Sequence, residues 1–356
     1  MTPNTLQLQR NVLFRSVNLA KGNPFLSLRA IPFLIVLASF ALLPAVRAQV
    51  VKTIPVGPPP DSLEGIAANP KAFSEVYVAD LLDFRVGFIN TISNTLEGFL
   101  DLGNEPVGLT TSPDGLTLYI TEDPDFLEAI SLVTFDQIYK VTVNPGPAIP
   151  AVTSDNSTVY VPCQTSPGTV VVVGGPNTGK IIKVGGKLAL DAVFTADNST
   201  AYVTTESKQI AVIDTATAKV TGKINTLTLT FGLAINGTTL YAAGINNVYV
   251  IDTTTNTITN TIKFHGGPDR WLATLPAVTP DGAFLYVPVA ENLNPPAVNN
   301  IVLVIDTSTN KIVQTQTVGN EPIQVACAAN DIYGYSSNVF DGTVSAYNLA
   351  HPPPGP

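Results

Sequence analysis

The chain has 356 residues, of which 45% are hydrophobic and only 13% are charged, and it contains 29 prolines and 26 glycines. Its 18 Lys and Arg residues are outnumbered by 27 Asp and Glu residues, so it lacks the basic footprint that binding to nucleic acid requires. We therefore exclude nucleic acid as a partner. Runs rich in Thr and Val disfavour long helices, and the composition indicates an all-β protein.

The first 48 residues predict a signal peptide. They carry five basic side chains and no acidic one, and an apolar run from Ile31 to Val46 leads into Val46-Arg47-Ala48. This pattern is typical of a secretory signal that is cleaved after Ala48. The run is shorter than the roughly 20 residues that span a bilayer, so we expect no transmembrane span in the mature chain. An uncleaved anchor is the alternative.

Removal of the signal peptide makes the chain more acidic. Without its five basic residues, 13 basic side chains remain against 27 acidic ones, a net charge of −14. We expect such a protein to be secreted, periplasmic or held at the cell surface.

A strand centred on tyrosine recurs through the rest of the chain. The seven copies are separated by 39 to 47 residues and lie at Tyr77, Tyr119, Tyr160, Tyr202, Tyr241, Tyr286 and Tyr333. A period of about 40 residues is typical of one four-stranded blade of a β-propeller. One blade cannot bury its own apolar face, so the blades must stack around an axis. We predict a single seven-bladed β-propeller of antiparallel blades over residues 49–350, followed by a Pro-rich tail over residues 351–356, and we expect a monomer.

The order of the strands predicts how the ring closes. Six complete sets begin with inner strands near residues 64–69, 107–112, 148–153, 189–194, 230–235 and 273–279. The seventh set has only three strands, near residues 323–328, 332–337 and 343–347, before prolines that cannot continue a ladder. The segment Val50–Val56 has the form of a fourth strand. We predict that this N-terminal strand completes the last blade and removes its open edge.

Short polar motifs mark the turns between these strands. Asn90 and the Asp residues of three Ile-Asp-Thr units open the turn after each third strand, at Asp214, Asp252 and Asp306. Pro113-Asp114-Gly115 and Pro280-Asp281-Gly282 are typical of turns between the first and second strands. A short side-chain oxygen accepts backbone N–H bonds inside such turns, so we interpret these carboxylates as structural.

These units resemble the YVTN family of β-propeller repeats over residues 50–350. The resemblance is carried by the Ile-Asp-Thr units, by Val318 to Pro322, and by Tyr77-Val78, Tyr160-Val161, Tyr202-Val203 and Tyr286-Val287. It implies a propeller of the kind found in exported and surface-layer proteins. It implies neither a common activity nor a set of catalytic residues.

Several apparent motifs receive structural interpretations. Gly174 to Lys180 matches the first seven positions of a phosphate-binding P-loop, but Ile181 stands where Ser or Thr should meet magnesium. The acidic run from Glu122 to Glu128 lacks the spacing of a calcium loop and is expected to be a solvated connection. Cys163 and Cys327 are expected to lie about three blades apart, too far for a disulfide. We predict no cofactor and no metal site.

The remaining polar residues suggest a site at one mouth of the central channel. Connections from each fourth strand to the next inner strand gather there, and their polar and aromatic side chains are candidate ligand-binding residues: Asp61, Glu105, Lys187, His265, Asp269, Arg270, Trp271 and Glu321. A His, an Arg and an aromatic wall could form a small-anion pocket. The alternative is that His265 and Trp271 only shape a loop, with Arg270 paired to a neighbouring carboxylate.

Two functional classes follow from this arrangement. The first is an exported propeller that acts as a non-catalytic binding or interaction scaffold for an unknown protein or small molecule. The alternative is a lactonase-like hydrolase, in which His265, Arg270 and Glu321 would activate water and hold a carbonyl oxygen. The second class rests on analogy between folds, since one ring architecture carries many chemistries.

Overall fold

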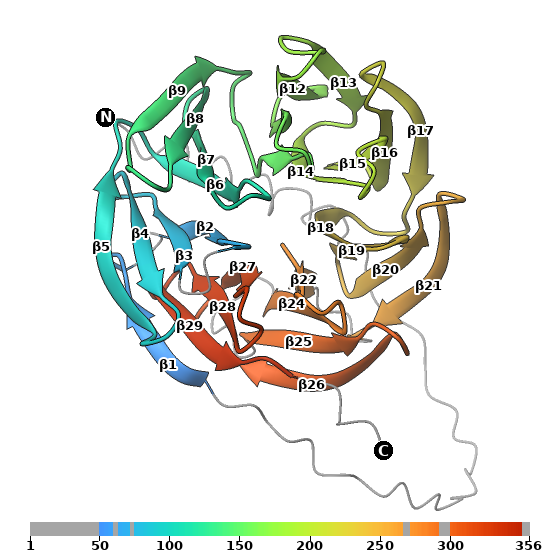
Figure 1. The fold of residues 1–356 in the computed structure, drawn as a ribbon. Helices are drawn as coiled ribbons and strands as arrows, with labels where there is room; N and C mark the ends of the chain where they lie inside the picture. The colour runs from blue at the N-terminus through green and yellow to red at the C-terminus, as the bar shows by residue number, and fades with distance from the viewer. Residues whose placement is uncertain (1–49, 60–62, 72–74, 266–270, 292–299, 351–356) are drawn as a thin grey trace, which may run out of the picture. The chain divides into compact units, whose positions relative to one another are not determined.

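The computed structural model describes residues 50–59, 63–71, 75–265, 271–291 and 300–350. All strands in these ranges belong to one compact unit, and no helix occurs among them. The strands form seven antiparallel sheets arranged as the blades of a ring, with the first strand of each blade around its centre (Figure 1). The predicted seven-bladed β-propeller is therefore confirmed.

Each blade is built from an inner, a second, a third and an outer strand. Blade 1 contains β2 (Leu63–Ala68), β3 (Glu75–Asp80), β4 (Arg85–Asn90) and β5 (Thr95–Asp101), and blade 2 contains β6 (Pro106–Thr111), β7 (Thr117–Glu122), β8 (Phe126–Ser131) and β9 (Gln137–Thr142). Blade 3 contains β10 (Ala151–Val152), β11 (Thr158–Cys163), β12 (Gly168–Gly174) and β13 (Ile181–Gly185), and blade 4 contains β14 (Ala189–Phe194), β15 (Thr200–Thr205), β16 (Gln209–Asp214) and β17 (Lys219–Asn225).

Two of the last three blades depart slightly from this plan. Blade 5 is regular, with β18 (Thr230–Asn236), β19 (Thr239–Gly244), β20 (Asn247–Asp252) and β21 (Thr257–Lys263). In blade 6 the inner strand is divided into β22 (Trp271–Ala273) and β23 (Ala277–Val278), which both pair with β24 (Phe284–Glu291), ahead of β25 (Ile301–Asp306) and β26 (Lys311–Thr317). Blade 7 supplies only β27 (Pro322–Cys327), β28 (Tyr333–Asn338) and β29 (Thr343–Asn348) from the end of the chain.

The N-terminal strand closes the ring. β1 (Val50–Pro55) lies beside β29, so that the sheet of blade 7 has the order β1-β29-β28-β27. Lys52 pairs with Ala346 and Pro55 with Thr343. Ile54 is buried in an apolar cluster between blade 7 and blade 1. The closure inferred from counting strands is confirmed.

The repeated tyrosine occupies the third position of each second strand. Tyr77 pairs with Ala67 of the inner strand, and Tyr202 pairs with Val193 in the same way. In blade 7 this place is taken by Tyr335, which pairs with Ala326, while Tyr333 only begins the strand. The seventh copy of the repeat is therefore Tyr335, and its identification as Tyr333 was wrong.

Apolar side chains from neighbouring blades share the core. One buried cluster lies at each junction; the cluster between blades 1 and 2, for example, joins Tyr77 and Val86 to Leu109 and Leu118. Burying a side chain of this size contributes about 1.5–3 kcal/mol. Because each cluster needs both of its blades, stability is shared around the ring.

Glycines allow the inner strands of adjacent blades to approach closely. A Cβ atom at Gly65 would lie 2.8 Å from the backbone nitrogen of Leu109, and one at Gly232 would lie 2.4 Å from the carbonyl oxygen of Thr274. Any larger residue at these positions would force neighbouring inner strands apart.

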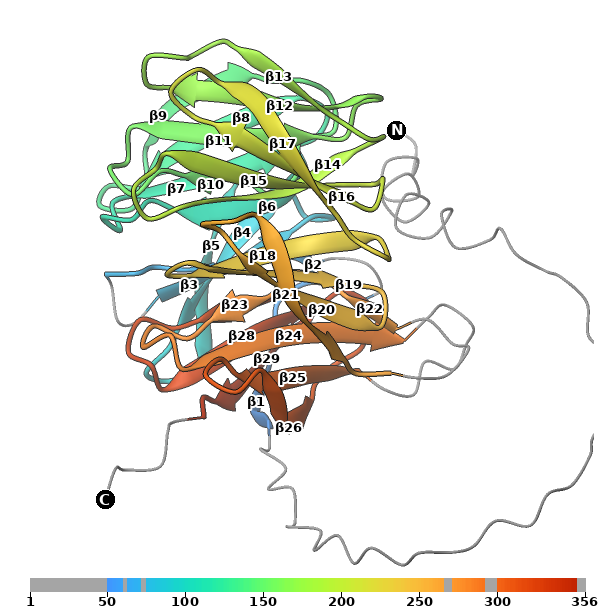
Figure 2. The ribbon, with the colours of Figure 1, turned by 90° about the vertical axis from the view of Figure 1, so that its right-hand side faces the viewer.

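The ring has two distinct ends. We call the end that carries the turns between inner and second strands the turn end, and the end that carries the connections from outer to inner strands the loop end. Figure 1 looks onto the turn end, and Figure 2 shows the ring from its side with the turn end on the left. In the part of the chain that the structure describes, no helix is long and apolar enough to span a membrane.

Candidate functional site

The loop end carries the residues that the sequence proposed as a site. Glu105, Lys187 and Glu321 precede the inner strands of blades 2, 4 and 7, and His265 and Trp271 lie between blades 5 and 6. Asp61, Asp269 and Arg270 lie outside the described residues. The fold therefore places five of these residues at one end of the ring, on four different blades.

His265 and Trp271 contact each other. Their rings stack with centroids 4.5 Å apart and an interplanar angle of 17°. The backbone N–H of Trp271 donates to Oδ1 of Asn246 at 2.7 Å, and the Trp271 carbonyl accepts the backbone N–H of Asn246 at 2.9 Å. Trp271 also packs against the apolar cluster between blades 5 and 6. These contacts fix the start of the inner strand β22.

His265 is the group that a hydrolytic mechanism would need as a base. Among the described residues it makes no hydrogen bond and no ion pair, and its Nε2 atom is buried. The catalytic set of His265, Arg270 and Glu321 stays a prediction, because Arg270 is outside the described ranges.

Glu105 and Glu321 occupy equivalent places in blades 2 and 7. The Glu105 carbonyl accepts the N–H of Asp123 at 2.9 Å, and the Glu321 carbonyl accepts the N–H of Val339 at 3.1 Å. Each contact ties the connection before an inner strand to the connection after the second strand. Burial, followed by the charge of Asp123, raises the pKa of the Glu105 carboxyl.

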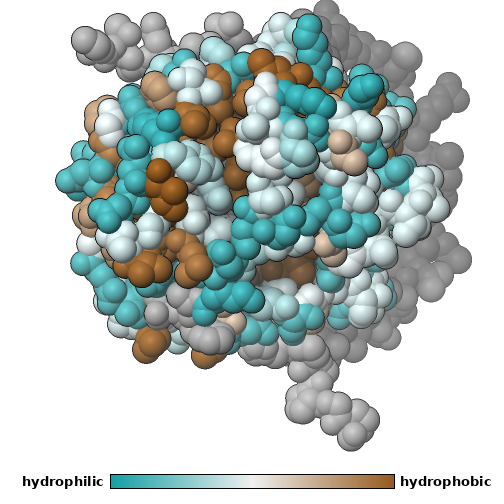
Figure 3. Space-filling model, turned by 45° about the horizontal axis from the view of Figure 1, so that its top comes forward, coloured by the Kyte–Doolittle hydropathy of each residue, from teal (hydrophilic) through white to brown (hydrophobic). Residues whose placement is uncertain are grey.

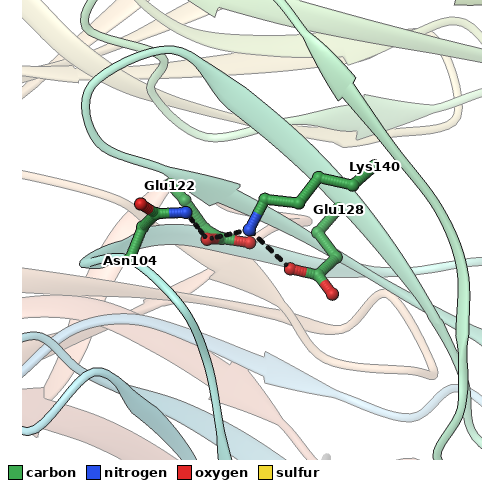
Figure 4. A network of polar contacts seen from close by, with 4 residues as sticks. All are labelled: Asn104, Glu122, Glu128 and Lys140. Carbon is green, nitrogen blue, oxygen red and sulfur yellow. Dashed lines mark hydrogen bonds and ion pairs between the residues drawn. The ribbon is translucent and has the colours of Figure 1, made fainter.

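The acidic run in blade 2 forms an internal network (Figure 4). Lys140 Nζ donates to Glu122 at 2.6 Å and to Glu128 at 3.0 Å, and Asn104 donates to Glu122 at 2.9 Å. Glu128 and Lys140 face each other directly on β8 and β9. Desolvation, assisted by Glu128, raises the pKa of Glu122 to about 7.

This network corrects the expectation of a solvated acidic connection. The Glu122 side chain is fully buried and that of Glu128 is nearly so. The two carboxylates share one lysine, which compensates the cost of burying them. Among the described residues, no three His, Cys, Asp or Glu side chains cluster in a way that could hold a metal.

The sequence that resembles a P-loop belongs to blade 3 and contacts blade 4. It links β12 to β13, as predicted for a hairpin turn. Asn177 Nδ2 donates to the carbonyl oxygens of Thr215 at 2.9 Å and Ala216 at 3.1 Å, and Lys180 Nζ donates to that of Thr217 at 3.2 Å. Lys180, which would reach the phosphates in a P-loop, here holds the neighbouring turn together with Asn177.

The turn carboxylates are structural, as predicted. Asp214 accepts hydrogen bonds from the backbone and hydroxyl of Thr217, and Asp306 accepts the same pair from Ser308. These bonds lower the pKa of both carboxyl groups, because they stabilise the ionised form. Cys163 and Cys327 are both free thiols, which confirms that they do not form a disulfide.

A cavity lies in the central channel and faces the turn end, opposite the predicted site. Its volume is about 490 Å³, and it is lined mainly by the second halves of the inner strands. The wall mixes apolar side chains, such as Ile149 and Ile235, with polar ones, such as Thr110, Thr111 and Gln324. Figure 3 looks obliquely onto this end and shows apolar surface at the bottom of a hollow with hydrophilic residues on its rim.

Two polar side chains lie at the deep end of this lining. Asp191 accepts the N–H of Ala192 at 2.8 Å on Oδ1 and that of Leu233, from the next blade, at 2.7 Å on Oδ2. Gln324 accepts the N–H of Ile66 from blade 1 at 3.1 Å. Each side chain thus connects its inner strand to the next one around the ring.

Sequence reasoning missed both residues. A comparison of the inner strands places Asp191 and Gln324 where blades 1, 2 and 5 have Gly65, Gly108 and Gly232. Four blades lack glycine at this position, with Ile149 and Leu275 in blades 3 and 6, and the polar residues in blades 4 and 7 were the available signal.

Comparison with known proteins bears on the fold alone. No protein-family model and no curated protein matches the chain. A solved structure described as Kuenenia stuttgartiensis hydrazine synthase is similar, with a TM-score of 0.69 and 15% sequence identity, over 83% of this chain and 97% of that chain. The chain therefore shares the β-propeller fold with a structure that is only 15% identical to it in sequence.

Proposed function

We propose that the protein is an exported β-propeller of the YVTN type that acts as a non-catalytic binding scaffold. The single observation that carries the binding role is the cavity of about 490 Å³ at the turn end, to which inner strands from around the ring contribute. Ligand sites in proteins are typically concave and mostly apolar, with volumes of about 300–1,000 Å³ and a few placed polar groups. The channel has a volume in this range and offers both aliphatic and polar side chains.

Use of the polar residues elsewhere supports the same proposal. The carboxylates of the turns and the P-loop-like segment are occupied in holding hairpins and neighbouring blades together. The turn residues therefore serve the fold, and the channel is the better candidate for a ligand site. A volume of this size suits a small molecule or the side chains of a partner protein.

A substitution at the channel rim tests the binding role. Ala196 is exposed and belongs to the channel lining, so Ala196→Trp should narrow the mouth without disturbing the core. Val133→Trp is the matched control, since Val133 is 71% exposed and does not belong to that lining. Small molecules that raise the melting temperature of the wild type should do so in Val133→Trp and fail in Ala196→Trp. Hits that survive in Ala196→Trp would place binding elsewhere.

Export is tested on the full-length chain. The basic residues and apolar run before Ala48 support a cleaved signal. Expression in a bacterial host followed by cell fractionation should yield a processed protein outside the cytoplasm that begins at Gln49, as measured by intact mass. An unprocessed cytoplasmic protein would contradict the proposal.

A further inference from the structure

Among the described residues, the channel lining contains one carboxylate, that of Asp191, and no Lys, Arg or His. The Asp191 side chain is buried, and its position in the first half of β14 places it deeper than the rim residues Thr195 and Asn198. Any ligand that enters from the turn end therefore meets polar groups at the rim and one acidic group at depth.

The carboxylate keeps capacity for a further partner. Two backbone N–H groups donate to it, one to each oxygen. A carboxylate offers about four acceptor positions, so each oxygen can accept one more hydrogen bond. Burial removes the water that would solvate the ionised carboxylate, and the two N–H donors compensate this loss only in part. The pKa of Asp191 is therefore raised to about 7. A cation beside Asp191 would supply the missing stabilisation.

Part of the wall is aliphatic and can contact the apolar body of a ligand. Ile149, Ile235 and Val278 belong to three different blades and contribute aliphatic surface to the lining. Gln324 lies at similar depth on blade 7 and adds an uncharged amide. An anion would meet the Asp191 carboxylate with no compensating charge, whereas an amine would pair with it.

We propose that the channel binds a small organic cation, with its ammonium group on the Asp191 carboxylate and its apolar body along the aliphatic wall. This inference rests on the proposed function, namely that the channel is the ligand site. Without the predicted signal peptide, 13 basic side chains remain against 27 acidic ones, a net charge of −14. This negative charge favours the approach of a cation.

Three probes of similar shape and different charge test the inference. Benzylamine, benzyl alcohol and benzoate are titrated by calorimetry into the full chain at pH 8, where Asp191 is ionised. Benzylamine should bind about tenfold or more tightly than benzyl alcohol, because a hydrogen bond to a charged group is stronger than one between neutral groups. Benzoate should bind most weakly.

Asp191→Asn is the matched variant. Asn retains the shape of the side chain and an oxygen that can accept the Leu233 N–H, and it lacks the charge. In this variant the preference for benzylamine over benzyl alcohol should disappear. Should Asp191→Asn fail to fold, the ratio of the amine to the alcohol on the wild type still decides whether the site selects a cation.

The outcomes separate this inference from the proposed function. Equal binding of amine and alcohol to the wild type, or a preference that persists in Asp191→Asn, overturns the cation site. If Ala196→Trp then abolishes both interactions, the channel remains the ligand site. No binding of benzylamine by the wild type also overturns the cation inference, whereas the proposed function is judged by the broader screen against Ala196→Trp and Val133→Trp.

Discussion

At the scale of single residues, two of the repeated tyrosines donate to an asparagine in a turn of the following blade. The Tyr202 hydroxyl donates to Oδ1 of Asn256 at 2.7 Å, and the Tyr335 hydroxyl donates to Asn94. Both asparagines have positive φ, 55° and 53°, a conformation that Asn tolerates better than most residues. The tyrosine thus stabilises both its own strand and the next turn.

Blade 4 lacks this contact. Ala218 occupies the equivalent turn position with a φ of 52°, and the buried Tyr160 hydroxyl has no hydrogen-bond partner among the described residues. A small cavity of about 160 Å³ borders Tyr160 and the residues Thr215 and Ala216 of that turn. An alanine in the left-handed region and an unsatisfied buried hydroxyl both cost stability.

We predict that Ala218→Asn stabilises the protein. The new side chain should relieve the left-handed strain and accept the Tyr160 hydroxyl hydrogen, a gain of about 1 kcal/mol in the free energy of unfolding. Asn256→Ala makes the reverse change one blade away and should lose a similar amount. Urea denaturation measures both. A destabilised Ala218→Asn would show that blade 4 has no room for the blade 5 arrangement.

At the scale of the strands, the inner strands are held together by a mixture of glycines and bridging side chains. Gly65 and Gly232 allow backbone to approach backbone, whereas Asp191 and Gln324 span the same step with a hydrogen bond. In blades 3 and 6 the same position holds Ile149 and Leu275, whose backbone N–H groups donate to the next blade.

Gly232→Ala should consequently be costly. Its Cβ would overlap the Thr274 carbonyl, and overpacking of this kind costs about 1–3 kcal/mol. Gly98→Ala is the control, because a Cβ there meets nothing within 4 Å; it should be neutral or slightly stabilising. The two midpoints of thermal unfolding give the comparison. Similar midpoints would mean that the inner strands can separate at little cost.

The closing strand β1 should contribute substantially to stability. Ile54 is 2% exposed and Val51 is 48% exposed on the same strand. We expect Ile54→Ala to cost about 2–4 kcal/mol and Val51→Ala to change stability by less than about 0.5 kcal/mol. Removal of residues 50–57 should uncover the edge of β29 and cause association, which light scattering detects. An unchanged melting curve for the deletion would contradict this role of β1.

At the scale of the whole molecule, two buried carboxylates make stability depend on pH. Desolvation raises the pKa of Asp191 and of Glu122 to about 7, and it raises that of Asp80 as well. Ordinary carboxyl groups titrate near pH 4, so between about pH 4 and 7 the folded protein binds more protons than the unfolded chain. The free energy of unfolding should therefore fall as the pH rises through this window.

In the double variant Asp191→Asn, Glu122→Gln, the free energy of unfolding should fall less as the pH rises. Both replacements stay neutral, and Glu128 still pairs with Lys140 in the variant. Denaturant unfolding at several pH values between 4 and 8 gives the slope of the free energy of unfolding against pH for each protein. A variant slope equal to that of the wild type would show that these two groups do not carry the effect.

The sequence was informative about the ring because its repeat is local. Each blade reproduces the tyrosine strand and the polar turn within a short stretch, and counting strands then left β1 for blade 7. The channel was not predictable in this way, because each blade contributes only a few residues that meet once the ring is closed. The pairing of Glu122 with Lys140 was missed because the two are 18 residues apart on different strands.

The position of β1 also governs the route to the folded state. Because Lys52 pairs with Ala346, the last blade combines the first and the last of the described strands. Contacts so distant in sequence slow folding, since the chain must close a very long loop before the pairing stabilises it. Closure of the ring should therefore be the late step of folding. A circular permutant in which β1 directly follows β29 would turn this contact into a hairpin, and it should fold faster to the same ring.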